Sequence, residues 1–121
     1  MKKVNSTNAI NEEIIKATCG TAVTLFVIGG RWKLNILWQL LHRKMRYSDL
    51  KRNIPGISER ILVMQLRDLE KNELIKRTVY PEVPPRVEYE LTKLGRSMKP
   101  MLQQIEKWGL AYRKKVTTPR P

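Results

Sequence analysis

The stretch IPGISERILVMQLRDLEKNELI, residues 54–75, decides the fold of this chain. It opens with a Pro-Gly turn, and Ser58 follows as a typical N-cap residue. Apolar residues then recur at helical spacing: Leu62, Leu66 and Leu69. This spacing predicts a helix to about Lys71 with one buried face. The opposite face carries polar, charged and apolar side chains: Glu59, Arg60, Val63, Met64 and Arg67.

The preceding stretch, YSDLKRNIPG, indicates a shorter helix. Ser48 is the predicted N-cap, and the negative charge of Asp49 is favourable in the first turn. This helix must end before Pro55, because the residue that precedes a proline is pushed out of helical geometry. Two helices joined by a tight turn that contains glycine are typical of a helix-turn-helix, here over residues 48–71.

Two alternating segments, LIKRTVY and RVEYEL, follow the second helix and predict a hairpin over residues 74–91. The proline-rich PEVPP between them forms its exposed tip, because proline donates no ladder hydrogen bond. The predicted core face holds five apolar residues: Ile75, Val79, Val87, Tyr89 and Leu91. Helix-turn-helix and hairpin together make a winged helix, which reads DNA with the second helix in the major groove and the hairpin tip beside it.

The flanking segments are also predicted to be helical. Residues 8–30 indicate two short helices, the second ended by a glycine pair, and RWKLNILWQLLHRKM (31–45) is apolar nearly all round and should be the core helix. In the C-terminal segment 92–115, apolar residues repeat every three or four positions from the end of the hairpin: Leu91, Leu94, Met98, Met101, Ile105, Trp108 and Tyr112. An apolar repeat of this spacing forms a seam that is expected to pack against a partner helix. Gly95 and Pro100 interrupt it, so the helix should kink or properly start near Pro100.

The composition favours a nucleic-acid partner. Twenty-four Lys and Arg against eleven Asp and Glu give a formal charge of +13, for which nucleic acid is the first explanation and a membrane surface the second. No apolar run is long enough to span a bilayer, and the start lacks the apolar region of a signal peptide, so we expect a cytoplasmic protein. One cysteine, one histidine and no nucleophile beside an acid–base pair predict no metal, no cofactor and no enzyme.

Several motifs in the same order resemble the HxlR family of bacterial winged-helix regulators, relatives of the MarR group: IGGRWKLNILWQL, MRYSDLKRNIPGISERIL and LRDLEKNELIKRTVYPEVPPRVEYELTKLGRSMKP. The resemblance covers roughly residues 19–109. It implies a mainly α fold with a small β-hairpin, one winged-helix domain over residues 1–121. It also implies a homodimer, built from the N- and C-terminal helices, that regulates transcription from a near-palindromic operator.

The predicted DNA contacts come from both motif helices and the hairpin: Arg46, Tyr47, Ser48, Lys51, Arg52, Ser58, Glu59, Arg60, Val63, Met64, Arg67 and Arg86. The predicted dimer interface holds Ile10, Ile14, Met98, Met101, Ile105, Trp108 and Tyr112. The family usually has Thr-Gln where Val63 and Met64 stand, so the operator does not carry over. It usually has Asp-Gly at residues 72–73, where we expect Asn72 to adopt the left-handed conformation instead.

Val63 and Met64 either contact bases or pack internally, and two further alternatives stay open from the residues. Cys19, before a helix start, is either a thiol sensor of oxidants or electrophiles or a small hydrophobic residue, and a small-molecule effector is a further possibility. The second alternative concerns the function of the winged helix. Instead of a sequence-specific regulator, the winged helix could be an architectural or protein-interaction module with only nonspecific DNA affinity, which salt-titrated binding would distinguish.

Overall fold

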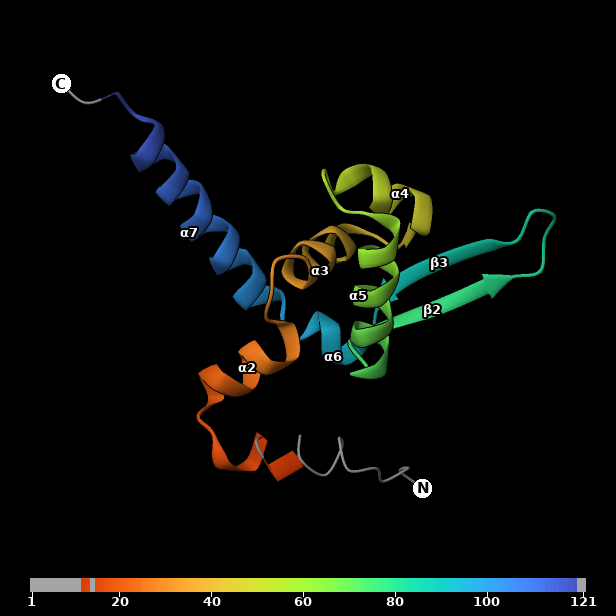
Figure 1. Cartoon of the computed structure of the whole chain (residues 1–121), viewed down its shortest axis with the longest axis horizontal. Coiled ribbons are helices and arrows are strands. Elements are labelled where there is room, and N and C mark those ends of the chain that lie inside the picture. The colour runs from red at the N-terminus through yellow and green to blue at the C-terminus, as the bar shows by residue number, and fades with distance from the viewer. Residues whose placement is uncertain (1–11, 14, 120–121) are drawn as a thin grey trace. The chain divides into compact units, whose positions relative to one another are not determined.

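The computed structural model describes residues 12–13 and 15–119, so the predicted dimer residues Ile10 and Ile14 lie outside the described part (Figure 1). The chain divides into residues 1–30 and 31–121, and each unit is described by itself. In the first unit, residues 12–13 and 15–17 are helical, and α2 spans Gly20–Ile28. The N–H of Gly29 donates to the carbonyl oxygen of Leu25 at 2.7 Å. The prediction that the glycine pair ends this helix is confirmed.

The second unit holds the remaining helices and strands. In chain order these are α3 (Lys33–His42), β1 (Met45–Arg46), α4 (Tyr47–Asn53), α5 (Glu59–Lys71), β2 (Ile75–Tyr80), β3 (Arg86–Leu91), α6 (Lys93–Arg96) and α7 (Lys99–Thr117). The strands form one antiparallel sheet in the order β1-β3-β2. The mainly α winged-helix fold predicted from the sequence is therefore confirmed.

The core of this unit lies among α3, α4, α5 and the inner part of the sheet. Its buried apolar side chains are Ile36, Leu37, Leu40, Met45, Leu50, Ile54, Ile57, Leu62, Leu66, Leu69, Leu74, Ile75, Tyr89, Leu91 and Leu102. All three residues predicted for the inner face of α5 are among them. Ser58 is the N-cap of α5, and its Oγ accepts a hydrogen bond from the N–H of Ile61 at 3.1 Å. The helix predicted from Ser58 to about Lys71 is confirmed in its bounds, cap and buried face.

The core helix is shorter than the predicted 31–45. It runs only from Lys33 to His42, and Met45 and Arg46 form β1 instead, opposite Tyr89 and Glu88 of β3. The helical pattern of the segment is overridden at its end because pairing satisfies the free edge of β3 and buries Met45. The prediction of a two-stranded hairpin therefore missed a third strand.

The prediction that Ser48 caps α4 is wrong. The N-cap is Arg46, and its backbone N–H donates to Oδ2 of Asp49 at 3.3 Å. Since Arg46 belongs to β1, its extended backbone fixes the helix start two residues earlier than the side-chain pattern suggested. Asp49 then stands at the third helical position, from which a carboxylate reaches back to the cap. Ser48 is left exposed in the first turn.

The hairpin has the predicted strands, with Ile75 opposite Leu91 and Val79 opposite Val87. Its inner half is buried, but Val79 is 49% exposed, so its expected core position is wrong. The reason is visible in Figure 1, where the outer half of β2 and β3 extends beyond the helices. Alternation fixes which face of a strand a residue occupies, whereas the neighbouring elements decide whether that face is covered.

The corner between α5 and β2 also differs from the expectation. Asn72 has φ −85°, and the left-handed residue is Glu73 with φ 62°. The N–H of Leu74 donates to the carbonyl of Leu69, and the N–H of Glu73 to that of Glu70, both at 3.0 Å. This is the Schellman pattern, in which the left-handed position is the second residue after the helix. The corner survives, but one residue later than predicted.

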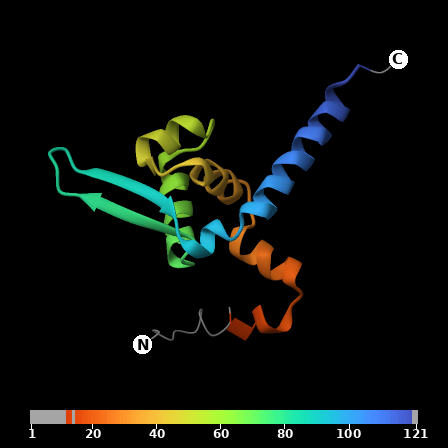
Figure 2. The ribbon, with the colours of Figure 1, turned by 180° about the vertical axis from the view of Figure 1, so that it is seen from behind.

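The predicted C-terminal helix is two helices. Thr92 caps α6 by accepting a hydrogen bond from the N–H of Gly95 at 3.1 Å, and α7 then begins at Lys99 with Pro100 in its first turn. The expected start near Pro100 is confirmed. Leu102 of α7 is buried and lines a small hollow together with α3 residues. Beyond this contact α7 extends away from the α3–α5 core, as both Figures 1 and 2 show.

Candidate nucleic-acid interface

The exposed face of α5 is built opposite its buried leucines. Arg60 and Arg67 are exposed there, and Met64 between them is 48% exposed. Val63 is only half-buried and turns toward the hairpin. Val63 and Met64, the two adjacent apolar residues of this helix, therefore have different surroundings. Met64 is available to a ligand, whereas Val63 forms part of a wall.

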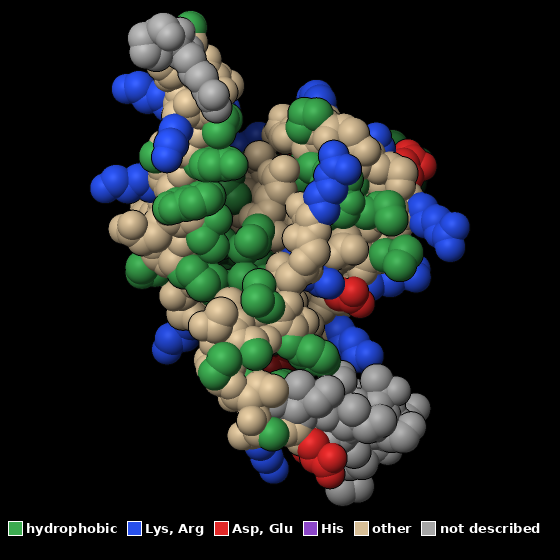
Figure 3. Space-filling view, turned by 60° about the vertical axis from the view of Figure 1, so that its left-hand side comes forward, with side chains coloured by type: hydrophobic (Ala, Val, Ile, Leu, Met, Phe, Trp, Pro, Cys, Tyr) green, Lys and Arg blue, Asp and Glu red, His purple; other side chains and the backbone are tan. Residues whose placement is uncertain are grey.

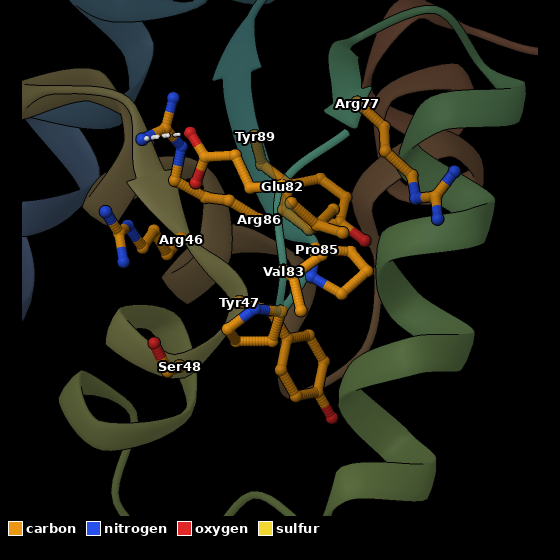
Figure 4. Close-up of a pocket in the computed structure, with 11 residues that line it drawn as sticks. Arg46, Tyr47, Ser48, Arg77, Glu82, Val83, Pro85, Arg86 and Tyr89 are labelled. Atoms are coloured by element: carbon orange, nitrogen blue, oxygen red, sulfur yellow. Dashed lines mark ion pairs between the residues drawn. The ribbon is translucent and has the colours of Figure 1, made fainter. Parts of the chain in front are cut away.

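That wall belongs to a hollow of about 390 Å³ between α5 and the hairpin, lined by Tyr47, Val63, Arg67, Glu70, Arg77 and Tyr89. A second hollow of about 570 Å³ runs from the start of α4 along the hairpin to its tip, lined by Arg46, Tyr47, Ser48, Arg77, Glu82, Val83, Pro84, Pro85, Arg86, Val87 and Tyr89 (Figure 4). The two share three residues: Tyr47, Arg77 and Tyr89. We call them together the α5–wing groove.

Tyr47 lies where these two hollows meet, and its hydroxyl donates a long hydrogen bond to the carbonyl oxygen of Glu59 at 3.4 Å. Burial raises the pKa of the Tyr47 phenol above its usual range, and the Glu59 carboxylate and Tyr89 add to the shift. An ordinary tyrosine phenol is already protonated at neutral pH, and a raised pKa leaves that state unchanged. The one O–H proton of Tyr47 is donated to Glu59 in this structure, so a contact to a phosphate oxygen requires the hydroxyl to turn away from that carbonyl.

Arginines without carboxylate partners line the groove or stand on the exposed face of α5. Within the described part of the chain, none of these four forms an ion pair: Arg46, Arg60, Arg67 and Arg77. Arg52 differs, because its Nη2 lies 3.3 Å from Oδ1 of Asp49. Lys51 is half-buried, and Ser58 and Glu59 are exposed at the start of α5. Unpaired guanidinium groups beside a concave surface suit the phosphates of a nucleic-acid backbone.

Arg77 belongs to this set but was not among the DNA contacts predicted from the sequence. It stands opposite Tyr89 in the hairpin and lies on the same face as Ile75. Strict alternation along the strand placed it there in advance, but only the apolar residues of that face were considered. Because α5 stands beside the hairpin, that face supplies a groove wall instead of core at this position.

Arg86 is held by neighbouring side chains of the wing. Its Nη1 lies 3.2 Å from Oε1 of Glu82, and its Nε lies 3.2 Å from Oε2 of Glu88. The guanidinium also lies over the ring of Tyr80, with its carbon 4.1 Å from the ring centre. Only 27% of the Arg86 side chain is exposed. The predicted DNA contact is thus engaged in contacts within the wing itself.

The predicted dimer seam is an exposed apolar strip on α7, where hydrophobic side chains gather in Figure 3. Trp108 is 68% exposed, and its ring stacks on Tyr112 with 5.2 Å between centres. Ile105 is exposed, while Met98 and Met101 are half-buried nearer the core. Val116 was not among the predicted interface residues. It continues the strip one turn beyond Tyr112, because the helix runs to Thr117.

The other predicted site residue is Cys19, which is exposed at the N-cap position of α2. Among the described residues, no three His, Cys, Asp or Glu side chains are grouped so that they could hold a metal ion. In the same part of the chain, no helix combines the length and the hydropathy that crossing a bilayer requires.

Comparison with known proteins gives one consistent family. The model of the HxlR-like helix-turn-helix family matches residues 27–117. YkvN of Bacillus subtilis (strain 168), named an uncharacterized HTH-type transcriptional regulator, is 47% identical over 97 residues, covering 80% of this chain and 82% of that protein. An HTH-type transcriptional regulator of Methanothermobacter thermautotrophicus is 48% identical over 94 residues, covering 78% of this chain and 72% of its own length.

Solved structures agree with this assignment. The redox regulator HypR in its oxidized form has a TM-score of 0.74 and 41% identity, covering 77% of this chain and 96% of that chain. Its reduced form has a TM-score of 0.76 and 39% identity, covering 81% of this chain and 97% of that chain. The resemblance read from the sequence motifs is confirmed.

Proposed function

The chain belongs to the HxlR-like helix-turn-helix family of transcriptional regulators, and from this membership we propose that it is a homodimer that binds a near-palindromic operator in the cytoplasm. The single observation that carries the proposal is the exposed face of α5 beside the α5–wing groove. There Arg60, Arg67 and Arg77 carry guanidinium groups that no carboxylate of the described chain neutralises. We assign α5 to the major groove and the α5–wing groove to the phosphate strand beside it.

The contacts divide by chemistry. Arg60 and Arg67 can reach base edges or phosphates from the rod of α5. Arg46, Ser48, Arg77 and the protonated Tyr47 face the groove and supply sequence-independent phosphate contacts (Figure 4). Ser58 and Glu59 stand at the N-terminus of α5, where backbone N–H groups favour an anion. Lys51 and Arg52 of α4 add positive charge near the same strand.

The test begins with an operator selected from random duplexes, followed by fluorescence-anisotropy titrations near physiological salt. We expect the selected duplex to bind about 10³-fold more tightly than scrambled DNA. Replacing Arg60 with Gln should cost about 1–3 kcal/mol at the operator if it reads a base, and should weaken all DNA alike if it touches phosphate. Lys107→Gln, on exposed α7, is the charge-matched control. Equal affinity for every duplex would instead favour the architectural or protein-interaction module.

The dimer is supported by the exposed strip on α7. Trp108, Tyr112 and Val116 would cost free energy if left in water, and a helix with a three-four apolar repeat buries that repeat against another helix. The palindromic operator follows from such a dimer, because a two-fold axis places two copies of α5 in successive major grooves. In the first unit, Leu25 and Phe26 of α2 are also exposed and can contribute to the same assembly.

A redox response through Cys19 is a second part of the proposal. It rests on the exposed thiol at the start of α2 and on the similarity to a protein named as a redox regulator. Because the chain has one cysteine, a disulfide must join Cys19 to another molecule, either a partner protomer or a small thiol.

Treating the operator complex with diamide tests this part. We expect a change in operator affinity that dithiothreitol reverses and that Cys19→Ser abolishes. A Cys19→Ser variant that responds to diamide as the wild type does would exclude the thiol, and an unresponsive wild type would exclude redox control by this oxidant.

A further inference from the structure

We propose that the wing meets DNA through its apolar tip, Val83-Pro84-Pro85, placed in the minor groove, and that Arg86 positions this tip without touching phosphate. The inference rests on the proposed DNA-binding function and adds the chemistry of one contact. Apolar side chains, proline among them, are known minor-groove wedges. The usual alternative, in a protein with such a high positive charge, is a wing whose Arg or Lys side chain contacts phosphate.

The contacts of Arg86 carry the first half of the argument. Two carboxylates, those of Glu82 and Glu88, lie 3.2 Å from its nitrogens, and the ring of Tyr80 covers one side. Nζ of Lys44 lies 3.6 Å from Glu88, so the cluster of two acids and two bases has no net charge. A phosphate that approaches the Nη1 or Nε side of Arg86 competes with two carboxylates, although the Nε–H is an ion-pair partner of Glu88 without a hydrogen bond. The wing therefore offers little electrostatic attraction at its outer end.

The same contacts hold the tip in place. Glu82 precedes the tip and Arg86 follows it, so their ion pair closes the loop at its base. Tyr80 stands opposite Arg86 at the end of the ladder, and its ring stacks under the guanidinium. Three side chains from both strands and the loop are thereby tied together. Arg86 is a positioning residue in this arrangement.

What projects beyond this closed base is apolar. Val83 is fully exposed, and Pro84 and Pro85 beside it are exposed as well. Because Val83 is fully exposed, it contributes nothing to the folded core, and its branched apolar side chain is free to contact a partner. The tip residues also form the outer wall of the α5–wing groove, continuous with the phosphate-facing Arg46 and Arg77. If a phosphate strand fills this groove, the tip lies across that strand from α5, in the adjacent minor groove.

The first experiment measures how much the apolar tip contributes to operator affinity. Val83→Ala should weaken operator binding by about tenfold for each wing, the order expected for removing two buried methyl groups, and so by about a hundredfold for the dimer. Its thermal midpoint should equal that of the wild type. Val79→Ala removes the same two methyl groups from the stem of the hairpin and should change affinity less than about twofold. Operators carrying 2,6-diaminopurine for adenine at the flanks gain an amino group in the minor groove only, and should bind the wild type more weakly but Val83→Ala no differently.

The second experiment separates positioning from phosphate contact. The double variant Glu82→Gln, Arg86→Gln removes one charge of each sign, so the net charge of the protein is unchanged. A lost phosphate contact lowers the slope of log K against log salt by about 0.9 per protomer. We expect the double variant to keep the wild-type slope with reduced affinity, and Arg77→Gln to lower the slope.

The outcomes are separable from failure of the proposed function. Wild-type affinity for Val83→Ala, an equal loss for Val79→Ala, insensitivity to diaminopurine, or a lowered slope in the double variant would each overturn the inference while specific operator binding stands. If the wild type prefers no duplex, the proposed function itself fails, and the inference fails with it.

Discussion

Met64 is the side chain at the centre of the exposed face of α5, with Arg60 and Arg67 on either side. A thioether is at best a weak hydrogen-bond acceptor, so it cannot read the polar edge of a base pair strongly. The one apolar feature of the major groove is the 5-methyl group of thymine. At the residue scale, specificity beneath Met64 should therefore depend on that methyl group.

Replacing single thymines of the selected operator by deoxyuridine tests this dependence, because only the methyl group is removed. At the position under Met64 we expect the wild type to lose about 1 kcal/mol of binding free energy, the lower end of a good base contact. Met64→Ala should bind both duplexes equally. Fluorescence anisotropy gives the dissociation constants for both duplexes. Equal affinity of the wild type for every deoxyuridine-substituted duplex would contradict the methyl contact.

Gly95 is the residue with the tightest backbone surroundings in the hinge before α7. A Cβ there would lie 2.2 Å from the carbonyl oxygen of Leu74 and 3.2 Å from a methyl carbon of Leu91. Gly95→Ala must shift α6 away from the corner after α5, which we expect to cost about 1–3 kcal/mol of unfolding free energy. Urea denaturation measures it. Gly109→Ala, where a Cβ meets nothing within 4 Å, should be neutral or stabilising.

At the scale of elements, the corner between α5 and β2 sets the angle of the wing. It depends on Glu73, which adopts a left-handed conformation that ordinary side chains disfavour by about 1–2 kcal/mol. Thr92 fastens the same corner, because its hydroxyl donates to the carbonyl oxygen of Glu73 at 2.6 Å. The chain therefore holds the wing with backbone geometry in addition to side-chain packing.

Glu73→Gly should relieve this conformation. We expect the unfolding free energy to rise by about 0.5–1 kcal/mol, since the entropy that glycine adds to the unfolded chain offsets part of the gain. The neighbouring Asn72→Gly is the control. Asn72 has an ordinary φ of −85°, so its replacement relieves no strain and only lowers the unfolding free energy through the added entropy of the unfolded chain. Thermal and urea unfolding measure both variants, and equal losses in the two would contradict strain at Glu73.

At the scale of the whole molecule, the exposed strip on α7 predicts the oligomeric state. Trp108→Asp places a carboxylate in the strip and should shift the dimer toward monomer. Leu110→Asp makes the same kind of change on the other side of the helix, where Leu110 is 44% exposed, and should leave the dimer intact. Analytical ultracentrifugation distinguishes the two. Equal masses for the wild type and Trp108→Asp would rule out this strip as the interface.

Loss of the dimer should also lower operator affinity. Two linked recognition helices bind their half-sites with an effective concentration that a monomer lacks, so Trp108→Asp should bind a full operator little better than a half-site. Duplexes with one and two half-sites make the comparison directly. A variant that is monomeric and still binds the full operator as tightly as the wild type would argue against a dimeric reading mode.

The extent of sequence-based prediction varied with the kind of feature. The bounds, cap and buried face of α5, the two wing strands and the start of α7 near Pro100 followed from local signals: a Ser-capped repeat, alternation, and a proline that cannot sit inside a helix. Strand β1, the cap of α4 and the exposure of Val79 did not follow. Each of these features depends on which element packs beside it, and the local sequence pattern does not specify that neighbour.

The sequence by itself determined the winged-helix order of elements, the family, and the arginines and apolar residues placed on the outer face of α5. Only the tertiary structure decided how these side chains are used. It separated exposed Met64 from half-buried Val63, brought Arg77 into the α5–wing groove, and engaged Arg86 with Glu82 and Glu88. The physical reason is that periodicity fixes the direction of a side chain, whereas its burial and its ion pairs depend on residues brought close by folding.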